Sequence, residues 1–381
     1  MVGTLLVIGM IAGFALYQYI KGGLITGFIF LVAGIVGIAA AFGYYELLAG
    51  YVKDYGFIGP KAYPLAFFIT FMAAFIITKE VANNLLRPEI SFGPMVDKAG
   101  GVALGALVGY LLAGVILVVI GLTPYKTNWL YGRFEDKISN PPQPSGMLFN
   151  PDGFVTGLFG TLSNGSLKGT QSFALVHADY IDQIFLNRHQ VSDGVWPIAQ
   201  DGAVSLIAPG VHATPENLME APRQQDQQPQ PFTPDPGKTL TLVKLQINSS
   251  ALTPSDGESE LQPKLALGQL RLIVKAKQEA GTSSSGSGEA IYPIGYINAA
   301  GQLAIKSLDT MLDDKVLKSE TDFAFNIPEN TVPILIEFRH NSIEEIKPMA
   351  APAVLPPAEQ PAAPPSTEPN TADPNAASPQ V

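Results

Sequence analysis

The chain contains no cysteine, and it has only four histidines among its 381 residues. Without thiols it can form neither disulfide bonds nor thiolate metal sites. The histidines are not spaced as metal ligands on a helix, and no second type of ligand accompanies them. They are His177, His189, His212 and His340. We therefore expect neither a metal nor a cofactor.

Charge is scarce in the first third of the chain. Up to residue 123 there are six basic and five acidic residues, whereas the remainder has 17 basic and 28 acidic residues, a net charge of −11. Binding to phosphate groups needs clustered positive charge, so nucleic acid is excluded as a partner of the acidic remainder, and anionic lipid is disfavoured. The chain thus divides into a nearly uncharged part and an acidic, water-soluble part.

Four long apolar runs fill the first third of the chain: residues 2–20, 24–46, 64–86 and 99–123. About 20 apolar residues in a helix cross a hydrocarbon core of about 30 Å. The third run is interrupted by Lys79 and Glu80, after which it continues as an amphipathic segment. The first run has no basic segment before it and no small-residue cleavage site, which indicates a membrane span and not a signal peptide. Residues 1–123 are predicted to be a four-span domain in a lipid bilayer.

Glycines recur in two of these runs. Gly101, Gly105 and Gly109 are spaced four apart, which places them on one face of a helix, and Gly34 and Gly37 belong to a similar series of small residues. Small residues let two helix backbones approach closely, and such packing drives helix association in lipid. We predict that these five glycines are helix-packing positions, used within the chain, in self-association, or with a protein partner.

Two short motifs resemble those of the CvpA family, the colicin V production proteins. Lys21–Gly22 precedes the second run where that family has Arg–Gly, and Asp97–Lys98 precedes the glycine series where the family has Asp–Arg. Lysine keeps the charge at both places but lacks the planar fork of arginine. The resemblance covers residues 1–123, and the region that follows is an addition to it. It implies an integral inner-membrane protein without enzymatic activity, with a role in the cell envelope or in toxin production.

The basic residues between the runs predict an orientation. Four of them, in the loops after the first and third runs, are Lys21, Lys79, Arg87 and Lys98. The other side has Lys53 and Lys61 in the middle loop, and Lys126, Arg133 and Lys137 after the last run, where charges that lead into a long domain count for less. Cytoplasmic loops carry the excess of such charges. We therefore expect a multi-pass protein of the bacterial inner membrane, with both termini and the C-terminal region outside the cytoplasm. The usual topology of the CvpA family agrees with this arrangement.

The part after residue 123 is predicted to contain five segments: an interfacial segment and linker (124–147), a mostly helical segment (148–219), a Gln- and Pro-rich linker (220–236), an antiparallel β-sandwich (237–346) and a disordered tail (347–381). The sandwich is predicted from six or seven short strands with alternating apolar residues, a pattern typical of immunoglobulin-like modules. Pro293 and Pro333 in strand-like runs indicate edge strands. A shift of the apolar phase between Leu242 and Val243 indicates a β-bulge.

The fold class predicted from the sequence is therefore an α-helical membrane domain, then a small α+β region that ends in an immunoglobulin-like sandwich, then a disordered tail. Three functions are compatible with it. The chain could be a non-enzymatic membrane protein of the CvpA type that presents an acidic extracytoplasmic domain. It could be a component of a transporter or channel that uses Asp97–Lys98 and Lys79–Glu80 in a polar pathway. It could also be an envelope enzyme with a dispersed active site in residues 148–340.

The enzyme reading has the weakest support in the sequence. Ser163 and Ser166 lie in a glycine-bearing turn but not in the G-x-S-x-G pattern of a nucleophile elbow. No nucleophile, base and orienting group occur together in the sequence. We favour the first function and expect no catalytic residues.

Overall fold

The computed structural model describes most of the chain up to residue 346. The described residues are 2–53, 55, 58–85, 92–125, 129–133, 147–165, 172–188, 197–200, 202–215, 217–223, 227–252, 264–277, 287–312, 316 and 319–346. The predicted disordered tail lies outside them, as do Arg87, Ser166 and His189.

Four long helices form the N-terminal part: α1 (Val2–Lys21), α2 (Leu24–Val52), α3 (Ala62–Leu85, after the 3-10 helix η1, Gly59–Lys61) and α4 (Pro94–Leu122). All four are long and apolar enough to cross a membrane. The sequence predicted their existence, and this is confirmed. Their ends differ from the prediction in one important place, because α2 continues past Glu46 to Val52.

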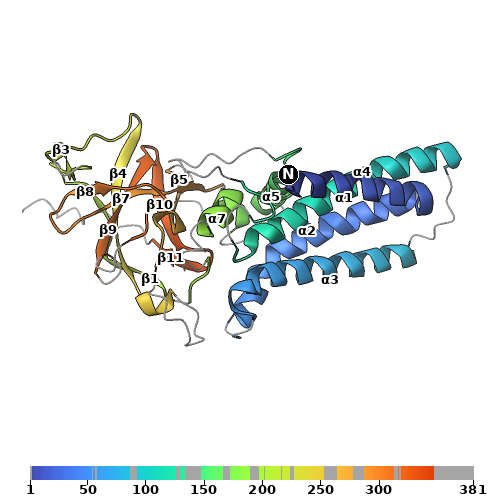
Figure 1. Ribbon diagram of the computed structural model, residues 1–381, viewed down its shortest axis with the longest axis horizontal. Coiled ribbons are helices and arrows are strands. Elements are labelled where there is room, and N and C mark those ends of the chain that lie inside the picture. The colour runs from blue at the N-terminus through green and yellow to red at the C-terminus, as the bar shows by residue number, and fades with distance from the viewer. Residues whose placement is uncertain are drawn as a thin grey trace, which may run out of the picture. The chain divides into compact units, whose positions relative to one another are not determined.

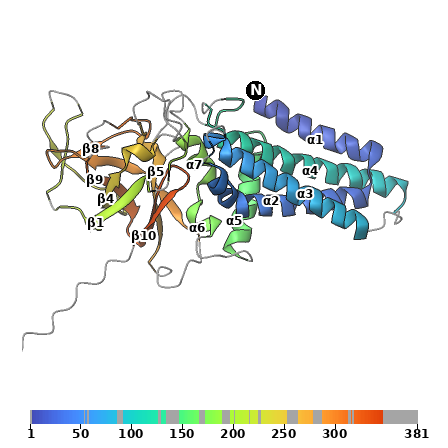
Figure 2. The same ribbon diagram turned by 90° about the horizontal axis from the view of Figure 1, so that it is seen from below.

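Helix α4 is the central helix of this bundle. It packs against α1, α2 and α3, and also against the helices α5 and α7 that follow it. In its most apolar stretch, 56% of the residues are buried, compared with 17% in α1. Figure 2 shows α1 on one side of α4, with α2 and α3 on the other. A glycine-rich helix is suited to this position because several neighbours can reach its backbone.

The outer faces of the helices are apolar. Large exposed side chains on them include Leu5, Ile8, Leu16, Phe28, Ile35, Val36, Leu47, Leu65, Phe68, Ile69, Ile76 and Ile77. Exposed apolar surface of this extent is expected where lipid, not water, surrounds a helix.

Three shorter helices follow: α5 (Pro151–Asn164), α6 (Phe173–Val176) and α7 (Tyr180–Asn187). They lie in the first part of residues 148–219, for which the sequence predicted mostly helix. Val155, Phe159, Ile184 and Phe185 belong to the same apolar core as the long helices, and the ring of Phe42 on α2 stacks on Phe159 at 5.2 Å between centroids. This helical segment is therefore packed onto one end of the bundle, as Figure 1 shows.

The β-rich region contains two sheets. Their strands are β1 (Val204–Ala213), β2 (Met219–Glu220), β3 (Gln230–Pro231), β4 (Lys238–Ile247), β5 (Leu270–Ala276), β6 (Glu289–Ile291), β7 (Pro293–Ile297), β8 (Leu303–Ile305), β9 (Thr321–Pro328), β10 (Thr331–Phe338) and β11 (Ser342–Glu345). The larger sheet has the order β1-β4-β9-β7-β8-β2-β3, and the smaller one β11-β10-β5-β6. Neighbouring strands are antiparallel except for β2 and β8.

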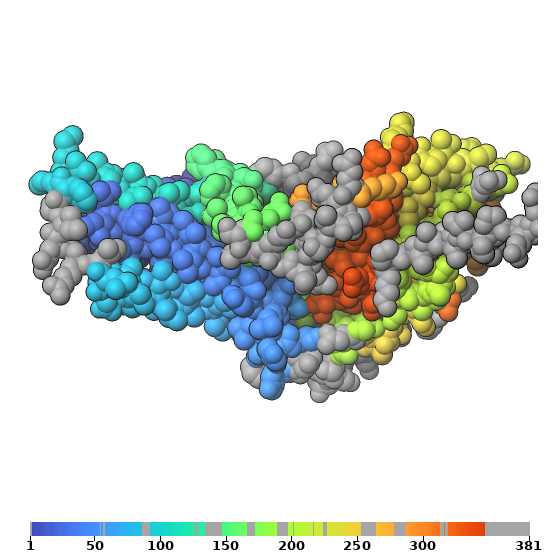
Figure 3. Space-filling model, turned by 180° about the vertical axis from the view of Figure 1, so that it is seen from behind, coloured from blue at the N-terminus to red at the C-terminus, as the bar shows by residue number. Residues whose placement is uncertain are grey.

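The two sheets share one apolar core. It contains Val243 and Phe325 from the larger sheet and Leu272 and Phe338 from the smaller one. The opposite face of the smaller sheet meets the helical segment, where Val176 of α6 packs with Ile273 and Leu335. The order of layers is therefore bundle, helical segment, smaller sheet and larger sheet; Figure 3 shows the same order from behind. A β-rich region with antiparallel sheets is confirmed, whereas the immunoglobulin-like detail is not.

The predicted edge positions of the two prolines are wrong. Pro293 begins β7, which lies between β9 and β8, and Pro333 lies in β10, which is between β11 and β5. Both prolines stand at shifts of register, one before Gly295 and the other before Leu335. Such an irregularity removes the need for the N–H that proline lacks, so an inner strand can accept it.

The predicted bulge is also misplaced. Strand β4 pairs with β9 without interruption from Lys238 to Leu245, and the shift of register lies in β1, between Leu206 and Val211. Leu242 and Val243 are both buried because β4 has an apolar cluster on each of its faces. Strand β1 itself lies in residues 148–219, for which the sequence indicated mostly helix.

Candidate functional site

Two of the histidines meet a carboxylate of α2 at the junction of the helices and the sheets. Nε2 of His177, which ends α6, lies 3.1 Å from Oε1 of Glu46. Nε2 of His340, in the turn after β10, lies 3.6 Å from the same oxygen. Both histidines are buried. Residues 46, 177 and 340 are thus brought together from three parts of the chain, and we call them the histidine cluster.

Tyr45 connects His340 to this carboxylate. Its hydroxyl donates to Glu46 at 2.7 Å and lies 2.6 Å from Nε2 of His340. Since the hydroxyl proton goes to Glu46, Nε2 of His340 must be the donor to the Tyr45 oxygen. The Tyr180 hydroxyl also donates to this oxygen, at 3.0 Å. Nε2 of His340 therefore carries a proton. Its buried Nδ1 has no hydrogen-bond partner among the described residues, so a proton there would have no acceptor, and the arrangement fits the neutral Nε2–H tautomer.

His177 has charged neighbours on both sides of its ring. Nε2 faces the Glu46 carboxylate, which can only accept, so Nε2 carries a proton. Nδ1 lies 2.8 Å from the amide oxygen of Gln183, which accepts, and 3.1 Å from Nη2 of Arg271, which can only donate. These two neighbours favour opposite states of Nδ1, whereas the carboxylates of Glu46 and Glu337 favour the imidazolium.

A second group of charges continues from His177 into the smaller sheet. Arg271 of β5 pairs with Glu337 of β10 and with Asp179 before α7. The Tyr292 hydroxyl donates to Asp179 as well. The side chains of Arg271 and Glu337 are only 2% and 0% exposed. Because charge is costly to bury without a partner, this arrangement depends on each ion keeping its counter-ion.

The pKa values follow from this arrangement of charges. Burial alone would lower the pKa of His177, but the carboxylates of Glu46 and Glu337 raise it above its ordinary value. Burial lowers the pKa of His340 to about 3, and Glu46 offsets this only in part because His177 and Arg271 also lower it. Burial raises the pKa of Glu337, against the opposing effect of Arg271. The two histidines thus have pKa values displaced in opposite directions.

His340 is expected to remain neutral at a pH at which a free histidine is mainly protonated. We expect 15N NMR of histidine-labelled protein at pH 5.5 to show His340 as the neutral Nε2–H tautomer and His177 as the imidazolium. A protonated His340 at pH 5.5 would contradict the assignment.

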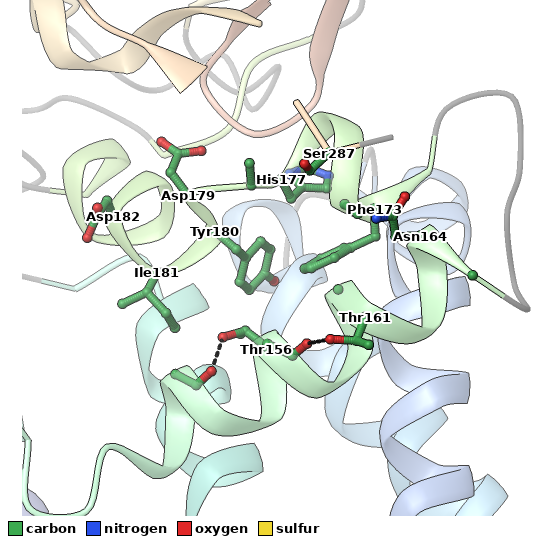
Figure 4. Close-up of a pocket in the computed structure, with 16 residues that line it drawn as sticks. Thr156, Thr161, Asn164, Phe173, His177, Asp179, Tyr180, Ile181, Asp182 and Ser287 are labelled. Carbon is green, nitrogen blue, oxygen red and sulfur yellow. Dashed lines mark hydrogen bonds between the residues drawn. The ribbon is translucent and has the colours of Figure 1, made fainter. Parts of the chain in front are cut away.

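A cleft of about 670 Å³ lies beside the histidine cluster, between α5 and the α6–α7 segment. Figure 4 shows the rings of Phe173 and Tyr180 near its centre, Asp182 at one end and Asn164 at the other. The hydroxyl of Thr156 donates to the carbonyl of Asp152 at 2.9 Å, within its own helix. Burial, and then the nearby Asp179, raises the pKa of Asp182 to about 6. His177 lines this cleft, so the cleft brings solvent close to the cluster.

The side chains of the histidine cluster can bind and release protons and can form ion pairs. Among the described residues, no group of three or more His, Asp or Glu side chains is arranged to hold a metal ion. Oγ of Ser163 accepts a hydrogen bond from the backbone N–H of Ala174 at 2.8 Å, so this hydroxyl joins α5 to α6. The sequence pointed to neither His177 nor His340 as members of one site. Arg271 and Glu337 are cross-strand partners of β5 and β10 in the structure.

The residues of the two family motifs meet at the opposite end of the bundle. A Cβ at Gly23, next to Gly22, would lie 4.0 Å from Cβ of Asp97, and one at Gly22 would lie 1.6 Å from Oε1 of Gln18. Lys98 lies 5.1 Å from the ring centroid of Tyr19, near the exposed Lys21. Gly22 therefore leaves room for a buried glutamine at the turn from α1 to α2.

The predicted packing glycines contact different neighbours. Cβ atoms at Gly101, Gly105 and Gly109 would lie 3.1 Å from the Gly23 carbonyl carbon, 2.6 Å from the Phe14 carbonyl oxygen and 2.3 Å from the Met10 carbonyl oxygen. These three glycines face α1 and the turn that follows it. A Cβ at Gly37 would lie 2.9 Å from the ring of Phe71 on α3, and one at Gly34 would lie 3.9 Å from the side chain of Leu111 on α4. Their role in assembly stays a prediction.

The charged pair proposed for a polar pathway lies on the surface of α3. Nζ of Lys79 is 3.2 Å from Oε1 of Glu80, and their side chains are 32% and 59% exposed. Lys79 also lies 5.8 Å from the ring centroid of Phe30. This geometry fits a lysine that reaches along an aromatic side chain towards the membrane surface.

Four apolar helices of spanning length, with lipid-facing outer surfaces and a β-rich region at one end, define a polytopic membrane protein. Residues 4–133 match the model of the family described as Colicin V production protein. The family resemblance found in the sequence is thus confirmed for the membrane part. No curated protein and no solved structure matches the chain.

Proposed function

We propose that this chain is a non-enzymatic inner-membrane protein of the colicin V production type, whose helix bundle presents the acidic β-rich region outside the cytoplasm. The observation that carries the proposal is the attachment of that region to α2 through the histidine cluster. A domain that only trails from its last span does not need buried polar bonds to the second span. The bundle therefore serves as a platform for the β-rich region.

The ends of the bundle support a common side for the N-terminus and the β-rich region. A Cβ at Gly3 would lie 2.8 Å from side-chain atoms of both Tyr131 and Met147, so the start of α1 lies next to the exit from α4. Lys21, Lys79 and Lys98 lie at the opposite end of the bundle. By the positive-inside rule that opposite end faces the cytoplasm.

The proposed orientation is tested by cysteine labelling, for which the native chain gives no background because it has no cysteine. Ala300 is exposed in the turn between β7 and β8, and Met95 is 86% exposed at the start of α4. We expect Ala300→Cys to react with a membrane-impermeant maleimide on intact spheroplasts and Met95→Cys to react only after lysis. The reverse result would place the β-rich region in the cytoplasm.

The envelope or toxin-related role proceeds from the family match and from the surface that the bundle presents. Its partner is proposed to be a protein that contacts either the β-rich region or the glycine-bearing helices, with no nucleic acid involved. Deletion of residues 204–346, with the bundle retained in the membrane, is expected to abolish the envelope or toxin phenotype. An unchanged phenotype would assign the function to the bundle alone.

A further inference from the structure

We propose that Glu46, His177 and His340 form a pH-sensitive latch, which holds the turn after β10 against α2 near neutral pH and releases it on acidification. The inference goes beyond the proposed function. It concerns the contacts of the cluster and not the side of the membrane, so a failed labelling experiment would leave it standing.

The latch joins elements that are distant in the sequence. Glu46 comes from α2, His177 from the end of α6, and His340 from the turn between β10 and β11. The ring of Tyr63 on α3 also packs against His340, at 5.1 Å between centroids. A change at His340 therefore acts on the contact between the sheets and two of the long helices.

In the structure, which we call the closed form of the latch, no acceptor is available for a second proton on His340. Its Nε2–H already donates to Tyr45, and its Nδ1 is buried with no acceptor among the described residues. The ring of the positively charged His177 lies 5.6 Å away. The carboxylate of Glu46 is engaged by both His177 and Tyr45. A protonated His340 therefore gains stability by moving into water.

The groups that face His340 come from every element around it. They are Tyr45 and Glu46 from α2, Tyr63 from α3, His177 from the end of α6, Tyr180 from α7 and Arg271 from β5. Glu337 from β10 interacts with His177 and Arg271. Two of these are cations, and both lower the pKa of His340. Glu46 is the carboxylate that raises it.

The sign of the pH dependence follows from the two histidines. Because the pKa of His340 falls from its ordinary value of 6.5 to about 3 in the closed form, the closed form loses relative stability as the pH falls below about 6.5. The pKa of His177 is raised, so its contribution is complete below about 6.5 and is lost as the pH rises through the raised value. The latch is therefore most stable near pH 6.5.

Glu337 contributes with a sign opposite to that of His340. Its pKa is raised, so it favours the closed form at the acid end and loses this contribution as the pH rises through the raised value. The acid opening must for this reason be assigned by a variant of His340 and not from the wild-type profile alone.

The test is a distance measurement in the full chain in lipid nanodiscs. Spin labels are attached at Tyr51→Cys, exposed on α2, and at Glu345→Cys, exposed on β11. We expect a single narrow distance distribution at pH 6.5 and a second, longer population at pH 4.5 that disappears on return to pH 6.5. If His340 alone provides the coupling, the ratio of open to closed form rises about fifty-fold between these pH values.

Variants separate the latch from a general effect of acid. His340→Gln retains an N–H donor for Tyr45 but cannot titrate, so its distribution should stay narrow at pH 4.5. His212→Gln, which alters the other histidine–carboxylate pair, should open as the wild type does. The proposal is overturned if the wild type stays narrow at pH 4.5, or if His340→Gln opens like the wild type.

A second measurement guards against a misfolded variant. In the wild type, the pH at which the long-distance population grows must coincide with the protonation of His340 in the 15N spectrum. Opening while His340 is still neutral also overturns the proposal.

Discussion

Replacing Arg271 with methionine is expected to lower the free energy of unfolding by about 3–5 kcal/mol, because it leaves Glu337 buried without its counter-ion. The donor that remains for Glu337, the Gln183 amide, is neutral and does not replace the lost charge. Asp179 loses the same partner. We expect pulse proteolysis of the full chain in urea to show the loss.

Two further variants make this expectation specific. Lys244→Met removes an ion pair with Glu320 (3.0 Å) whose side chains are 29% and 51% exposed, and it should cost at most about 1 kcal/mol. Arg271→Met combined with Glu337→Leu removes both buried charges and should recover much of the stability. If Arg271→Met cost no more than Lys244→Met, the buried ion pair would have no structural role.

Gly109→Ala is expected to destabilise the packing of α1 against α4 by about 1–3 kcal/mol, as overpacking of a close contact does. The added Cβ would lie 2.3 Å from the Met10 carbonyl oxygen, and one of the two backbones must move to accept it. Alanine otherwise favours a helix by about 1 kcal/mol relative to glycine, so the clash works against the intrinsic preference. Unfolding in mixed micelles of increasing SDS content measures the change.

The matched control is Gly43→Ala on α2, because no heavy atom lies within 4 Å of a Cβ built there. This variant should be neutral or slightly more stable. Gly105→Ala, with a Cβ 2.6 Å from the Phe14 carbonyl oxygen, should behave like Gly109→Ala. Equal stability of Gly109→Ala and Gly43→Ala would contradict the packing role of the glycine series.

The glycines of α4 also show what spacing alone leaves open. Gly114 and Gly121 were not selected from the sequence. A Cβ at Gly114 would nevertheless lie 2.4 Å from the Pro151 carbonyl oxygen, and one at Gly121 would lie 2.5 Å from the Ile184 side chain. Spacing indicates which residues share a face. Which helix or loop packs against that face depends on the tertiary structure, here on the packing of α5 and α7 against α4.

The histidine cluster illustrates the same limit more sharply. Residues 46, 177 and 340 are separated by more than a hundred positions each, so no local pattern connects them. Glu46 ended an expected span, and the histidines stood alone. They meet because α2 continues for another six residues beyond Glu46 and because the turn after β10 lies against it.

The four apolar helices, the family of the membrane part and the alternation of the strands could be predicted from the sequence, because hydrophobic period and length are local properties. In the structure, Arg271 and Glu337 lie on the opposite face of their strands from Leu272 and Phe338. That this polar face is buried against α6 and α7 follows only from the folding of distant segments onto it. A charge can lie there only because partners from distant elements neutralise it, and the choice of those partners is a property of the whole fold.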